Sequence, residues 1–152
     1  MKKDFTILIA DRNRHVREFL KREMMAEGNN ILLAKSGQEV LKCIYDHNKP
    51  LDLLILELDL PDIGGLSILE KLQDRIPTLP VVVHTYLSEY LNHPDVLGAN
   101  AVVEKKGTNI DRLKEVVSDV LRKSYGHVKQ RPTRPARGAK LMKDPKEIVL
   151  KQ

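Results

Sequence analysis

Six polar residues in this 152-residue chain have the types and positions needed to handle a phosphoryl group. Carboxylates can hold Mg²⁺, a hydroxyl can bind a phosphoryl oxygen, and a lysine can pair with its charge. Each of the six follows or ends an apolar, strand-like segment, and such positions meet at one edge of an open α/β sheet, where these sheets bind ligands. The residues are Asp11, Arg12, Glu57, Asp59, Thr85 and Lys105.

The stretch from residue 52 to residue 66 contains the segment around which the rest of the chain is predicted to fold. Residues 53–56 form a short apolar run without a polar face, as expected of a central strand that is covered on both sides. The run ends in Glu57 and Asp59, and Pro61, Gly64 and Gly65 then break any regular element. The two carboxylates are therefore predicted to lie at the carboxyl end of the central strand.

Strand-like and helix-like segments alternate five times, which predicts an α/β fold with a doubly wound, five-stranded parallel sheet and helices on both faces. The predicted strands are residues 5–10, 31–34, 53–56, 81–85 and 101–104. The predicted helices begin near Asn13, Ser36, Leu66, Ser88 and Thr108. Apolar residues at spacings of three and four give the first helix its core face, namely Val16, Phe19, Leu20 and Met24.

Local signals fix several of the element ends. Asn13 is expected to cap the first long helix and Gly28 to close it in the left-handed conformation. Ser36 and the glutamate three residues later form a capping box. Ser88 is expected to cap a short helix, and Pro94 either ends that helix or lies in the first turn of a second one.

The positive charge of the chain is concentrated after the last predicted helix. The chain carries a net charge of +5, and residues 125–152 contain eight Lys or Arg against two acidic residues. We therefore predict a domain over residues 1–124 and a basic, Pro/Arg-rich, disordered tail over residues 125–152. The tail could hold nucleic acid or an anionic membrane surface through phosphates, without sequence specificity because it offers no aromatic residue beyond Tyr125. A solvated tail without a partner is the alternative.

Several functional classes are disfavoured by what the sequence does not contain. The single cysteine, Cys43, excludes an internal disulfide and favours a cytoplasmic location, with Cys43 as a small filler of the core. No apolar run is long enough to span a membrane, and Met1–Phe5 leave no room for a signal peptide. The histidines have no metal-ligand spacing, and no nucleophile–base pair or cofactor loop is visible, so we do not expect an enzyme.

Four segments in order resemble the receiver domain of bacterial two-component response regulators. The resemblance covers about residues 4–123 and implies a flavodoxin-like sheet of strand order 2-1-3-4-5. In that family a histidine kinase passes a phosphoryl group to an aspartate, and the change propagates through the threonine to the surface of the last helices. The segments are Ile7–Asp11, Asp52–Pro61 with Gly65 and Leu66, Val83–Thr85, and Gly98 through Lys105.

The sequence departs from the family pattern at four positions. Counting back four residues from Pro61, the phosphoacceptor position holds Glu57 in place of Asp. Arg12 replaces the second of the two acidic residues after the first strand, which leaves Asp11 as the candidate metal ligand. Lys106 replaces the proline that usually follows the lysine, which removes the main reason for a cis bond there. The fourth departure is Val102, which stands where the family has an aromatic ring.

The two departures at the acidic edge predict altered chemistry. Glu57 reaches further than an aspartate by one C–C bond, about 1.5 Å, and misplacements of about 1 Å can slow an in-line transfer on the order of a hundredfold. Glu57 could instead place a permanent negative charge toward Thr85 and Lys105. Arg12 is a fixed cation that is expected to pair with Asp11 or Glu57 and to disfavour Mg²⁺, so we expect no resident cofactor.

Two functional hypotheses follow from these residues. The first is a degenerate receiver that signals through protein contacts without phosphorylation, with Tyr86, Tyr90 and Leu91 on its interaction surface. The second is a working phosphorelay receiver that carries its phosphate on Glu57 or Asp59. The expected partner is a signalling protein, and a histidine kinase is one candidate. A second copy of the chain is another candidate. Asp62 is assigned to the turn, and His84 is expected to point to the face of its strand opposite Thr85.

Overall fold

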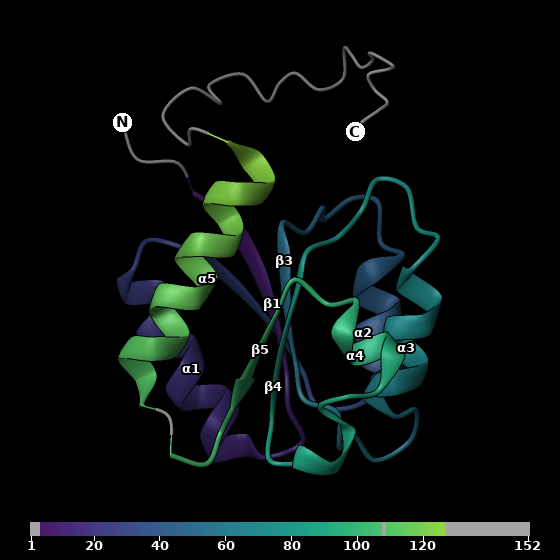
Figure 1. Cartoon of the computed structure of the whole chain (residues 1–152). Coiled ribbons are helices and arrows are strands. Elements are labelled where there is room, and N and C mark those ends of the chain that lie inside the picture. The colour runs from purple at the N-terminus through teal and green to yellow at the C-terminus, as the bar shows by residue number, and fades with distance from the viewer. Residues whose placement is uncertain (1–3, 108, 127–152) are drawn as a thin grey trace.

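The computed structural model describes residues 4–107 and 109–126 and places five parallel strands in one sheet (Figure 1). The sheet has the order β2-β1-β3-β4-β5, which confirms the predicted doubly wound fold. Parallel pairing brings the carboxyl ends of all five strands to the same edge of the sheet. The strands are β1 (Thr6–Ala10), β2 (Asn30–Ala34), β3 (Leu53–Leu56), β4 (Val81–Thr85) and β5 (Ala101–Glu104).

Helices cover both faces of the sheet. Figure 1 shows α1 and α5 together on one face, and α2, α3 and α4 on the other. The chain therefore crosses from one face of the sheet to the other after β2 and returns after β5, as expected for a doubly wound sheet. The helices are α1 (Arg14–Ala26), α2 (Gly37–Ile44), α3 (Gly65–Leu72), the 3₁₀ helix η1 (Ser88–Tyr90), α4 (Pro94–Leu97) and α5 (Ile110–Tyr125).

The central strand is buried along its whole length, as its apolar run predicts. Leu54 and Leu56 belong to the core under α2, α3 and α4, whereas Leu53 and Ile55 belong to the core under α1 and α5. All four side chains are at most 1% exposed. Burying each such side chain contributes roughly 1.5–3 kcal/mol, so β3 anchors the carboxylates that follow it to both halves of the core.

The ends of the first two helices follow the local sequence signals. The Asn13 side chain accepts hydrogen bonds from the backbone of His15 and Val16, and Gly28 has φ of 94°. The Ser36 hydroxyl accepts from the N–H of Glu39, but the Glu39 carboxylate accepts from the N–H of Lys35 instead of that of Ser36. The capping pair is present, and its glutamate reaches one residue further back than in a capping box.

Two expectations about helix faces and ends were wrong. Phe19 is 40% exposed, because it lies at the border of the core face of α1, with the Arg22 guanidinium 5.8 Å from its ring centre. Ser88 lies inside η1 and does not cap it, since Leu87 precedes that helix and no side chain caps it. Pro94 is the first residue of α4, and the His93 ring caps that helix by accepting from the N–H of Asp95.

The last helix runs one residue beyond the predicted boundary at residue 124. The Tyr125 hydroxyl donates to the carbonyl of Asp52 over 2.7 Å, and its ring stacks on Phe5 at 5.6 Å. The rest of the predicted tail lies outside the described residues, so the division into domain and tail stays a prediction.

None of the described helices combines the length and the apolar character needed to cross a membrane.

Candidate functional site

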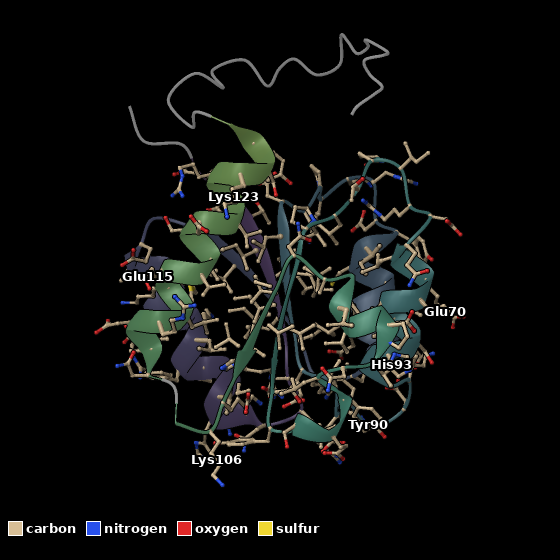
Figure 2. All side chains as sticks on the ribbon, viewed as in Figure 1. Glu70, Tyr90, His93, Lys106, Glu115 and Lys123 are labelled. Carbon is tan, nitrogen blue, oxygen red and sulfur yellow. The ribbon has the colours of Figure 1, made fainter. Side chains whose placement is uncertain are left out.

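The predicted polar residues meet where the strands end. Figure 2 shows Tyr90 and Lys106 at this edge, at the lower end of the molecule. Asp11, Glu57 and Thr85 are 2%, 4% and 0% exposed, although each lies at the end of a strand. The parallel sheet therefore brings together the carboxylates, the hydroxyl and the ammonium group that the sequence places after four different strands.

Lys105 holds the two buried carboxylates together. Its Nζ lies 2.5 Å from Oδ2 of Asp11 and 2.6 Å from Oε1 of Glu57, and its side chain is 7% exposed. Burial alone would lower the pKa of Lys105, but the hydrogen bonds to Asp11 and Glu57 outweigh burial and raise that pKa. Lys105 is therefore a cation at neutral pH, and it offsets the charge of two carboxylates that would otherwise repel each other.

Glu57 is surrounded by donors. Its Oε2 accepts from the Thr85 hydroxyl over 2.5 Å and from the backbone N–H of Asp59 over 3.0 Å, while Lys105 donates to its other oxygen. Burial would raise the pKa of Glu57, but the hydrogen bonds from Lys105, Thr85 and the Asp59 backbone lower it below its usual value. Glu57 is thus a buried, fully hydrogen-bonded anion at neutral pH.

Both carboxylate oxygens of Asp11 are also engaged. Its Oδ1 accepts from the N–H of Asn13 over 2.9 Å, and its Oδ2 accepts from Lys105. The Asp11 carbonyl in turn accepts from the Arg17 guanidinium over 2.8 Å. Asp11 is therefore held both by the N-terminal end of α1, through Asn13 and Arg17, and by Lys105 after β5.

Arg12 does not pair with Asp11 or Glu57, contrary to the prediction. Its guanidinium lies 3.1 Å from Oδ1 of Asp59, and the two side chains are 51% and 54% exposed. The ammonium of Lys105 already lies between the buried carboxylates, so the longer guanidinium extends outward to the loop after β3. Asp59 faces solvent, as expected, but it does so within an ion pair.

Thr85 links the buried anion to the start of η1. Its Oγ1 donates to Glu57 and accepts from the N–H of Leu87 over 3.0 Å. The hydroxyl is therefore part of the site, as predicted, and the backbone of Leu87 was not foreseen as a member. A change in the position of Glu57 would move the Thr85 hydroxyl, and with it the N–H of Leu87 that donates to this hydroxyl.

The predicted interaction surface lies beside this segment. Tyr86 and Tyr90 are 66% and 36% exposed, and Leu91 is half-buried. Leu91 also borders an open hollow of about 450 Å³ beside β5. The hollow is lined by apolar and charged residues, namely Leu91, Leu97, Val102, Val103, Glu104, Lys106 and Arg112.

Asp62 has a structural partner that the sequence did not reveal. Its carboxylate accepts from the N–H groups of Gly37 and Gln38 over 2.7 and 3.0 Å, so it caps α2 from the loop after β3. The hydrogen bond from the N–H of Ile63, followed by those from Gln38 and Gly37, lowers the pKa of Asp62. Gly37 is required at this contact, because a Cβ there would lie 2.2 Å from the carbonyl oxygen of Ile63.

The remaining candidates lie outside the acidic edge. His84 points to the α1 and α5 face, as expected, and burial followed by the charge of Lys105 lowers its pKa to about 4. Burial raises the pKa of the Cys43 thiol, which agrees with a filler role. The cis peptide bond among the described residues is Ile76–Pro77, so the bond between Lys105 and Lys106 is trans.

A sequence model of the response regulator receiver domain matches residues 7–118. The chain belongs to this family. It is 32% identical to the response regulator TrrA from Thermotoga maritima, solved in complex with Mg(2+)-BeF, and the match has a TM-score of 0.70 and covers 79% of this chain and 99% of that one. TrrA has also been solved in complex with the histidine kinase ThkA.

Curated relatives extend well beyond the matched region. Response regulator RR06 from Streptococcus pneumoniae is 32% identical over 83 residues, which are 55% of this chain and 37% of that relative. The CAI-1 autoinducer sensor kinase/phosphatase CqsS from Vibrio cholerae is 28% identical over 118 residues, 76% of this chain and 16% of that protein. The chain is thus a receiver domain of two-component signalling and spans about a third of RR06. Receiver domains are in general signalling modules and not enzymes.

Proposed function

We propose that this receiver signals through protein contacts without an aspartyl phosphate, and that Glu57 supplies a permanent negative charge in its place. One observation carries the proposal: the Glu57 carboxylate already accepts from Thr85, Lys105 and the Asp59 backbone. A hydroxyl and an ammonium group are the donors that a phosphoryl group would use. Because Glu57 already occupies these donors, a phosphoryl group would have to displace it to form the same hydrogen bonds.

The residues present do not fit the Mg²⁺ ion that the family implies. Mg²⁺ requires octahedral oxygen ligands and is usually held by one or two carboxylates. All four carboxylate oxygens of Asp11 and Glu57 already accept hydrogen bonds, and the ammonium of Lys105 lies between them. Within residues 4–107 and 109–126, no group of three or more His, Cys, Asp or Glu could hold a metal ion. No step of the proposed function uses Mg²⁺.

Output is proposed to pass through the segment after β4. The Thr85 hydroxyl joins Glu57 to the N–H of Leu87, and η1 with Tyr90 follows directly. Tyr86, Tyr90 and Leu91 are the surface residues that this linkage would position for a signalling partner. Because TrrA was solved with a histidine kinase, a kinase is the first partner class to test.

A labelling experiment tests the proposal. The protein is incubated with acetyl phosphate and Mg²⁺, and its intact mass is measured. We expect no acid-labile addition of roughly 80 Da, one metaphosphate unit. A double variant, Arg12→Asp with Glu57→Asp, restores both acidic positions of the family pattern and serves as the positive control. A stoichiometric adduct on the unmodified protein would contradict the proposal.

Phosphorylation on Glu57 or Asp59 is the alternative, and the 54% exposure of the Asp59 side chain favours it at that residue. The same assay on Glu57→Gln and Asp59→Asn assigns any adduct. If the adduct disappears in only one variant, that residue is the acceptor. If no adduct forms in any of the three proteins, the alternative is wrong.

The basic tail supports a separate proposal of non-specific binding to nucleic acid or to an anionic surface through its eight Lys and Arg residues. Truncation after Gly126 keeps Tyr125, which belongs to α5, and removes residues 127–152 with all eight of these Lys and Arg residues. Retention on a nucleic-acid column at low salt should be lost on truncation. Equal retention of the full chain and the truncated chain would end this proposal.

A further inference from the structure

We propose that three exposed side chains, Tyr86, Arg12 and Asp59, form a lid that closes the buried charges of the site to molecules in solution. This lid concerns access to the site and does not depend on whether Glu57 accepts a phosphoryl group. The carboxyl edge of an open α/β sheet normally faces solvent, since that is where ligands enter. The low exposure of Asp11, Glu57 and Thr85 therefore requires a cover.

Tyr86 covers the ammonium group of Lys105. The Nζ of Lys105 lies 5.4 Å from the centre of the Tyr86 ring, within cation–π range. Tyr86 itself is 66% exposed, whereas the Lys105 side chain is 7% exposed. One side of the aromatic residue thus faces solvent while the charge beneath it is withdrawn from solvent.

Arg12 and Asp59 cover the carboxylate side of the site. Their ion pair joins the loop after β1 to the loop after β3 over 3.1 Å. Asp59 is also tied to the site through its backbone N–H, which donates to Glu57. The side chain of Asp59 therefore belongs to the lid, while its backbone belongs to the closed site.

The contacts that hold the lid are of the kind that a docking protein can displace. Exposed ion pairs are weak because water and salt screen them, and a cation–π contact at the surface is of similar strength. By contrast, the interactions beneath the lid are short and buried. Opening the lid would expose Lys105 and its carboxylates without disrupting the core.

Acetylation of Lys105 measures how closed the lid is. The full-length protein is treated briefly with acetic anhydride, and peptide mass spectrometry gives the ratio of modified Lys105 to modified Lys106. Lys106 is an internal standard, because it is exposed and points away from the sheet at the same edge (Figure 2). The ratio should be well below one in the unmodified protein, partly because the ion pairs with Asp11 and Glu57 keep Lys105 in its unreactive, protonated form. The lid is therefore measured by the change in this ratio between variants.

Removing the ring should open the lid. We expect Tyr86→Ala to raise the Lys105 to Lys106 ratio by roughly twofold to fivefold, the change that loss of a surface cation–π contact corresponds to. Tyr86→Phe keeps the ring and should leave the ratio unchanged. Asp59→Asn and Arg12→Gln should each raise it by a smaller factor, and added salt should raise it in the unmodified protein more than in Asp59→Asn.

Two controls remove contacts of the same type elsewhere. Tyr45→Ala deletes a tyrosine that is 58% exposed at the end of α2, and Arg112→Gln breaks an exposed ion pair with Glu115. In both control variants the ratio of modified Lys105 to modified Lys106 should equal that of the unmodified protein. Tyr86→Leu, which fills space without a ring, is the substitute if Tyr86→Ala fails to fold. A ratio unchanged in Tyr86→Ala, or in Tyr86→Leu where that substitute is needed, would overturn the lid.

Discussion

The Oγ1 atom of Thr85 lies 2.5 Å from Oε2 of Glu57 and accepts from the N–H of Leu87 over 3.0 Å. One buried hydroxyl therefore joins the anion after β3 to the surface segment after β4. In the family to which this chain belongs, a threonine at this position responds to a phosphoryl group. Here its partner is an ordinary side chain that is present in every molecule.

Loss of the Thr85 hydroxyl should be costly. Thr85→Val keeps the shape, removes one of the two donors to Oε2 of Glu57 and leaves the N–H of Leu87 without this acceptor. Leaving a buried polar group unsatisfied costs about 1–3 kcal/mol. We expect the free energy of unfolding in urea to fall by about 1–3 kcal/mol. Thr85→Ser keeps the hydroxyl and should lose less. Equal losses for both variants would show that the methyl group matters and the hydroxyl does not.

Lys105 should be the most sensitive residue of the site. Lys105→Met leaves Asp11 and Glu57 buried together without a cation, and breaking such a buried pair costs about 3–5 kcal/mol. Urea unfolding at pH 7 measures the loss, and the loss should shrink at acidic pH, where the carboxylates can take up a proton. A variant that is as stable as the unmodified protein at pH 7 would contradict the charge arrangement.

The stability that Glu57 provides should depend on pH in one direction. The pKa of Glu57 in the folded protein lies below the usual 4.5. At a pH near these values, the Glu57 carboxyl group therefore binds fewer protons in the folded state than in the unfolded state. The stabilisation is therefore fully present above pH 4.5 and is lost as the pH falls through the folded-state pKa. Urea unfolding of the unmodified protein and Glu57→Gln should differ at pH 7, and the difference should shrink as the pH falls below 4.5. A difference that grows on acidification would refute the lowered pKa.

Two glycines next to the site offer a matched test of packing. A Cβ at Gly37 would lie 2.2 Å from the carbonyl oxygen of Ile63, whereas a Cβ at Gly64 would meet nothing closer than 3.9 Å. We expect Gly37→Ala to destabilise the protein by about 1–3 kcal/mol, because the backbone must shift to accept it. Gly64→Ala should be close to neutral in the same thermal unfolding experiment. Similar melting temperatures for the two variants would contradict the close approach of α2 to the loop after β3.

The fold and most of the site were predictable because their signals are local or periodic. The apolar run of β3, the cap at Asn13 and the glycine after α1 each act within a few residues, and parallel pairing then brings the strand ends to one edge. The positions of Thr85 and Lys105 followed from that topology. These predictions needed no knowledge of which side chains touch.

The contacts that were missed join residues far apart in the chain. Arg12 and Asp59 are 47 residues apart, and Asp62 and Gly37 are 25 apart. Long side chains choose among several partners according to where competing charges already lie, and this choice requires coordinates. The contact between the Tyr86 ring and Lys105 was missed for the same reason, because the two residues meet only when β4 and β5 pair in the folded sheet.

The most direct test of the account is a titration of the ¹⁵N-labelled protein with Mg²⁺ and beryllofluoride, observed through the amide signals of Asp59 and Leu87. These two N–H groups bond to Glu57 and Thr85, so they report on any ligand that enters the site. Because Glu57 already fills the site, we predict that neither signal shifts, while the Arg12→Asp, Glu57→Asp variant shows saturable changes at both. Saturable shifts of both signals in the unmodified protein would contradict the account.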